Sequence, residues 1–242
     1  MDTLDAFIII GLAALIHASF QLSVSVLTLL SGHTIGAKRS HAKLLRLTGS
    51  FVFGVAVMTL LLISFTSLLL LTLFGSAHEV PPLAWAMTCG LLLGLSVAVW
   101  SFYYRREQGT SLWLPRSLAT YLSGRTKATH RSAEAFSLGL TSVFAELLFI
   151  IAPIIVSSLV LIQLSPDLQL AGIALYTSVS LLSLLIVTAL IGSGHKLSRI
   201  QKWREDNKHF LQFVAGSGLM VLGFYTYVEQ VVAVAASAYG AK

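Results

Sequence analysis

The chain has 242 residues, of which 56% are hydrophobic and only 11% are charged, and its mean hydropathy is +0.83. Soluble globular domains carry about 25% charged residues, so this composition excludes an ordinary soluble domain. The formal net charge is +6, and the single cysteine, Cys89, excludes an internal disulfide and a dithiol relay.

Six apolar segments reach or exceed the roughly 20 residues that a helix needs to cross a bilayer. They are residues 6–31, 47–74, 82–104, 136–163, 169–192 and 209–236. Because lipid cannot satisfy backbone polar groups, each segment should be helical. The sequence therefore predicts an all-α integral membrane protein with six transmembrane helices.

The positive charges predict how these helices are oriented. Every Lys and Arg except Lys242 lies in one of three segments, 31–46, 105–133 and 193–208. Six alternating helices place these segments on one face, which the positive-inside rule makes cytoplasmic, with both termini outside. Topology explains the net charge, and the lipid bilayer, not nucleic acid, is the expected partner.

The second basic segment contains a pattern of its own. Leu114, Leu118, Tyr121 and Leu122 follow i, i+4, i+7, i+8 spacing within 111–125. That spacing favours a short amphipathic helix on the inner membrane surface. A plain linker is the alternative.

The chain matches itself at an offset of 128 residues, which aligns residues 11–12 with 139–140 and residues 89–93 with 217–221. Three helices per half place the second half upside down, as an inverted repeat. The predicted parts are a first three-helix repeat at 1–104, a cytoplasmic linker at 105–133 and a second repeat at 134–242.

One carboxylate, Glu146, lies in the middle of the fourth apolar segment. A charge at that depth costs roughly 2.5–3.5 kcal/mol on insertion scales, and such residues usually face a cavity, pair or carry protons. The offset places His17 opposite Ala145. Because the working site of inverted-repeat proteins lies at mid-membrane where the repeats meet, we predict a site for a solute or ion built on Glu146 and His17.

Neighbouring polar positions extend this prediction. Gln21 lies one turn after His17, and Ser142 lies one turn before Glu146. Pro153 frees a carbonyl one turn back, which is either an ion ligand or part of a simple kink. For Glu146 and His17 the alternative is a structural hydrogen bond to an adjacent helix. No zinc motif is present, so the sequence leaves a metal undecided, and we expect no cofactor.

Small residues at Gly90–Gly94 and Ser50–Gly54 would let helices approach closely. We expect these contacts inside the bundle. A homodimer or a partner membrane protein stays open as an alternative.

The segments 11–54, 136–154 and 210–228 resemble the lysine-exporter (LysE) superfamily, which includes amino-acid exporters, nickel/cobalt-type exporters and cytochrome-biogenesis thiol carriers. The resemblance implies a six-helix exporter fold in a prokaryotic plasma membrane. The exporters carry a proline in the first helix, which residues 17–23 lack. The thiol carriers carry cysteines in the first and fourth helices, which residues 17–23 and 145–153 lack. Thiol or electron transfer is therefore not expected.

Three functions fit these observations. The first is a secondary exporter of a small solute or cation, with Glu146 as proton or cation site. The second is a non-transporting accessory or scaffold protein that binds a partner protein or lipid. The third is an intramembrane enzyme using Ser19 or Ser23, which we do not expect because serines in membrane helices usually bond to their own backbone.

Overall fold

A computed structural model describes residues 2–20, 22–36, 41–75, 80–103, 116–195 and 197–232. These ranges are helical and contain no strand. The helices are α1 (Thr3–Ser19), α2 (Leu22–Gly36), α3 (His41–Phe74), α4 (Pro82–Phe102), α5 (Arg116–Ala128), α6 (Ser132–Leu161), α7 (Pro166–Ser180), α8 (Leu182–Gly192), α9 (Leu197–Asp206), α10 (Lys208–Tyr227) and the π-helix η1 (Val228–Val232).

Four helices are long and apolar enough to cross a membrane: α3, α4, α6, and α10 with its π-helical end. Two further pairs, α1 with α2 and α7 with α8, pass the same criterion together, which gives up to six spans if each bent pair is one span. The pairs are bent by 45° and 47°. The prediction of a helical membrane protein is confirmed, but the first and fifth segments are broken helices and not the continuous ones predicted at 6–31 and 169–192.

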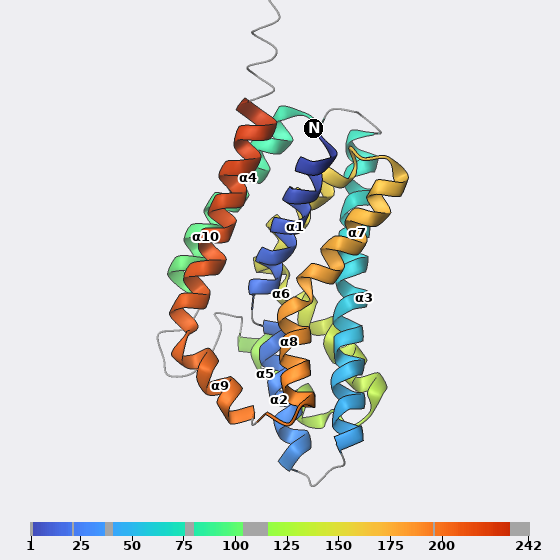
Figure 1. The fold of residues 1–242 in the computed structure, drawn as a ribbon, viewed down its shortest axis with the longest axis vertical. Coiled ribbons are helices and arrows are strands. Elements are labelled where there is room, and N and C mark those ends of the chain that lie inside the picture. Colours follow the sequence, from blue (N-terminus) through green and yellow to red (C-terminus); the bar gives the residue numbers. More distant parts are fainter. Residues whose placement is uncertain are drawn as a thin grey trace, which may run out of the picture.

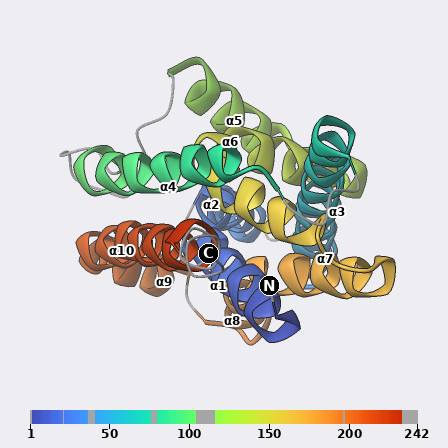
Figure 2. The same ribbon diagram turned by 90° about the horizontal axis from the view of Figure 1, so that it is seen from above.

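The breaks of both bent spans lie partway along the bundle, between its two ends (Figure 1). The chain starts at the end where α10 finishes, and the basic helices α5 and α9 lie at the opposite end. From above, α4 lies beside α10 and α3 lies beside α7, with α1 and α6 between these groups (Figure 2).

Large apolar side chains remain exposed on the outer helices, for example Phe65 and Leu69 on α3 and Phe213 and Phe224 on α10. Apolar patches of this extent on a protein surface mark a contact with lipid or with another protein. Since these helices are also long enough to span a bilayer, this surface suits acyl chains.

The contact between α3 and α6 depends on two glycines. A Cβ on Gly139 would collide with the carbonyl of Phe51, and a Cβ on Gly54 would collide with the carbonyl of Phe136. The backbones therefore touch directly, which is how small residues join membrane helices. Gly54 thus behaves as predicted.

Side-chain hydrogen bonds join α4 to α10. Ser96 donates to the carbonyl of Gly216 at 2.7 Å, and Gln212 Nε2 donates to the carbonyls of Val99 and Trp100, also at 2.7 Å. In an apolar bundle such bonds satisfy groups that lipid cannot. The small pair Gly90–Gly94 does not take part, because nothing lies within 4 Å of a Cβ built on either glycine.

Two short amphipathic helices lie at the basic end. α5 contains the buried Leu122 and confirms a helix within 111–125 from Arg116 onward; residues 111–115 lie outside the described residues. α9 was not predicted, because the basic residues of 193–208 indicated a loop. Ile200 on α9 is buried, and Trp203 is exposed.

The glycine contact gives the first prediction. Gly139→Ala should lower the stability by about 1–3 kcal/mol, because the new methyl group meets backbone that cannot move independently. Thermal unfolding in one detergent, followed by circular dichroism, measures the change.

Gly90→Ala is the matched control. Its methyl group enters open space, and alanine favours a helix over glycine by about 1 kcal/mol, so its stability should stay equal or rise. An equal change in thermal stability for Gly139→Ala and Gly90→Ala would contradict the direct backbone contact between α3 and α6.

Candidate functional site

The break between α1 and α2 exposes a helix N-terminus in the middle of the bundle. The first N–H groups of any helix lack acceptors within the helix, and at membrane depth no bulk water replaces them. On the α1 side the N–H of Phe20 donates to the carbonyl of His17 at 3.1 Å, which ends that helix. The N–H groups of α2 need an acceptor from elsewhere.

Glu146 of α6 supplies this acceptor. Its Oε1 accepts from the N–H of Leu22 at 3.0 Å, and its Oε2 accepts from Ser23 Oγ at 2.9 Å. The side chain is only 3% exposed. The carboxylate therefore caps α2 from a different helix, where the positive end of the helix dipole favours a negative charge.

Ser142 lies one turn before Glu146 and extends the same network. Its Oγ is 2.8 Å from the carbonyl of Gly139 and 3.3 Å from Ser23 Oγ. Since a hydroxyl has one proton, Ser142 donates to only one of the two at a time. Ser142 and Glu146 thus both contact Ser23.

His17 is buried but is not bonded to Glu146. Its Nδ1 lies 3.0 Å from the hydroxyl of Tyr176 in α7, and within the described part of the chain it makes no direct hydrogen bond to the carboxylate. His17 and Glu146 are therefore not joined by a direct hydrogen bond. The imidazole instead joins the first broken span to the second.

Both residues nevertheless line one small cavity of about 20 Å³, together with Phe20, Thr59 and Ser180. The cavity lies where both broken spans change direction. Thr59 is 1% exposed, and its Oγ1 has no hydrogen-bond partner among the described residues. A space of this size holds about one water molecule.

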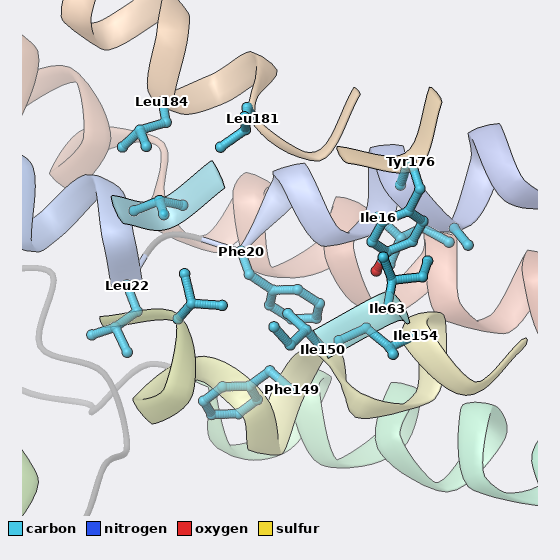
Figure 3. Close-up of a cluster of buried hydrophobic side chains, with 14 of the residues drawn as sticks. Ile16, Phe20, Leu22, Ile63, Phe149, Ile150, Ile154, Tyr176, Leu181 and Leu184 are labelled. Atoms are coloured by element: carbon cyan, nitrogen blue, oxygen red, sulfur yellow. The ribbon is translucent and has the colours of Figure 1, made fainter. Parts of the chain in front are cut away.

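Aromatic packing fixes the break itself. Phe20 stacks on Phe149 at a centroid distance of 5.8 Å and meets the ring of Tyr103 edge-on at 5.5 Å. Figure 3 shows Phe20 beside Phe149, with Tyr176 and Leu181 of the second broken span in the same buried cluster. The bend is therefore held by packing on one side and by hydrogen bonds on the other.

Three of the predicted site residues are not found in the lining of this cavity: Ser142, Gln21 and Pro153. Gln21 lies outside the described residues. Pro153 is buried within α6, which continues through it, and does not line the cavity.

Sequence reasoning missed Ser23, Thr59 and Tyr176 as members of the site. The polar residues Ser19, Gln21 and Ser23 surround the break but do not by themselves predict one. Ser19 Oγ donates to the carbonyl of Ile16 at 2.6 Å, the backbone bond expected of a structural serine. Among the described residues, no three His, Cys, Asp or Glu side chains gather to hold a metal.

Comparison of the chain with protein-family models, with curated proteins and with solved structures gives no match. The fold and the site therefore define a class: a membrane-embedded helical protein with a buried carboxylate at the break of a membrane helix.

Removing the acceptor should destabilise the break. Glu146→Leu leaves the N–H of Leu22 without its acceptor, which costs about 1–3 kcal/mol, and leaves the hydroxyl of Ser23 with only Ser142 Oγ, at 3.3 Å, as an acceptor among the described residues. Glu146→Gln keeps an amide oxygen as acceptor, so it should lose much less. Thermal unfolding of the two variants, measured in parallel, checks this difference, and a Leu variant as stable as the wild type would contradict the cap.

Proposed function

We propose that the protein is a secondary transporter of a small solute in a prokaryotic plasma membrane, with Glu146 as its proton or small-cation site. The observation that carries the proposal is a buried carboxylate at the point where two membrane spans are broken. Secondary transporters commonly bind ions and substrates at half-helix ends near the bilayer midplane.

The cavity beside Glu146 limits what this site accepts. About 20 Å³ admits a proton, one water molecule or a small cation, and excludes an organic solute in this conformation. Each carboxylate oxygen has a second lone pair after accepting one hydrogen bond. Together with the hydroxyl oxygens of Ser23 and Thr59, these lone pairs are ligands that a hard cation prefers.

The packing of the helices supports two related halves. Suppose that the two halves are exchanged, so that α1/α2 and α6 swap places, as do α3 and α7/α8, and α4 and α10. The contact of α3 with α6 then becomes the contact of α7 with α1. The contact of α1 with α10 becomes the contact of α6 with α4. The contacts α4–α10 and α1–α6 are unchanged by the exchange, because in each pair the two helices swap places with one another. All of these contacts are present. We therefore propose the inverted three-helix repeats that the sequence predicts.

The orientation is proposed on charge. The helices α5 and α9 and the start of α3 carry basic residues at one end of the bundle. The positive-inside rule places that end in the cytoplasm and both termini outside.

A specific observation favours a second function. Both oxygens of Glu146 already accept a hydrogen bond, so capping α2 alone explains why the carboxylate is there. A membrane scaffold or accessory protein needs no more than that. The two functions differ in whether Glu146 responds to a cation.

The test uses the purified protein in detergent with sodium, lithium or choline chloride at equal ionic strength, and a separate pH series. A ligand at 100 times its Kd stabilises the folded state by about 2.7 kcal/mol. We expect the wild type to respond to at least one small cation or to pH, and Glu146→Gln to lose that response while remaining folded.

The control is Glu134→Gln, which removes a carboxylate from the first turn of the same helix. It should keep the wild-type response. Equal responses in the wild type and Glu146→Gln would reject Glu146 as the ion site and leave the scaffold function.

A further inference from the structure

A second and much larger cavity adjoins the site. It has a volume of about 560 Å³ and lies between the α1–α2 break, α8, α9 and the start of α10. Val24 and Ser183 line both this cavity and the small one beside Glu146. The volume falls in the range of pockets for small organic molecules, about 300–1,000 Å³.

The walls of this cavity are mainly apolar. Aliphatic side chains from α8, α9 and α10 line it, among them Ile186, Leu190, Ile200 and Leu211, and the indole of Trp203 stands beside them. Such a surface gains free energy when an apolar body replaces water on it.

The ionisable side chains of the lining are all basic, and Ser19 and Ser183 complete its polar part. Arg199, Arg204 and His195 line the cavity, and its described lining contains no Asp or Glu. Arg204 is only 3% exposed and donates from its guanidinium to Ser25 Oγ at 2.7 Å, whereas Arg199 is exposed. A guanidinium matches the planar geometry of a carboxylate and binds it through two parallel hydrogen bonds.

We propose that this cavity binds a free organic anion with an apolar body. Arg204 and Arg199 hold the anionic head group, and the aliphatic walls of α8 and α10 hold the body. An uncharged or cationic molecule of the same length lacks the head-group contact. That the anion is the transported solute rests on the proposed function, whereas its binding does not.

Trp203 provides a direct probe of the occupant. The full-length protein is placed in phosphatidylcholine nanodiscs and titrated with ω-bromoundecanoate, whose bromine quenches tryptophan on contact. The probes ω-bromoundecanol and ω-bromoundecyltrimethylammonium report simple partition into the bilayer. We expect saturable quenching by the carboxylate alone, its displacement by decanoate, and its loss in Trp203→Phe.

Charge-loss variants test the head-group contacts. Arg204→Gln should weaken ω-bromoundecanoate binding about ten-fold or more, because it removes a buried charge-assisted hydrogen bond. Arg199→Gln should weaken binding by a few-fold, because its guanidinium is exposed and screened by water. The matched control is Lys202→Gln, which removes the same charge from α9 at a residue outside the cavity and should leave binding unchanged.

Arg199→Gln keeps the test decisive if Arg204→Gln fails to fold, since Arg199 is on the surface. Equal quenching by the charged and uncharged probes, or equal weakening by Lys202→Gln and Arg199→Gln, would overturn the proposal. So would quenching of Trp203 by brominated phosphatidylglycerol that decanoate does not displace, because the occupant would then be a bilayer lipid.

Failure of this inference is separable from failure of the proposed function. If the anion does not bind but the cation response of Glu146 persists, the anion site is wrong and the ion site stands. If the anion binds and neither cation nor pH affects the wild type, the anion site stands and the transport function fails.

Discussion

The structure depends on one constraint: a helix that begins inside a membrane must find acceptors for its first N–H groups. The N-terminus of α2 meets this constraint with the carboxylate of Glu146, which accepts from Leu22 and Ser23. The position of Glu146 on α6 therefore fixes where the first span breaks. The packing of Phe20 on Phe149, one turn further along α6, fixes the direction of the break.

The remaining helices divide according to this break. α3 and α6 are long helices in direct backbone contact, and glycine at both contact points makes that interface intolerant of change. The pair that corresponds to them, if the halves are exchanged, is α1/α2 with α7/α8, and both of its members are bent. The continuous helices α3 and α6 thus pack against the two broken spans, α1/α2 and α7/α8. The bond between His17 and Tyr176 joins the two bent spans next to their breaks, so that they form one unit.

The sequence could predict the apolar segments and the placement of Glu146 and Ser142 inside the bundle, because length, hydropathy and a lone carboxylate are local signals. It could not predict the break at Phe20, since no Gly or Pro lies there and the acceptor comes from α6, over 120 residues further along the chain. The partner of His17 was missed for the same reason, because Tyr176 is 159 residues distant and has no neighbouring signal. α9 was missed because its charges outweigh its few apolar residues.

The two cavities are linked through the first turn of α2. Ser23 is bonded to Glu146, Val24 lines both cavities, and Ser25 accepts from Arg204 in the wall of the larger one. Ser23 and Ser25 thus connect the carboxylate of Glu146 and the guanidinium of Arg204 through one helical turn. Coupling between two sites requires an element that both of them bias. The element that the two sites share here is a single helical turn, bonded to Glu146 at Ser23 and to Arg204 at Ser25.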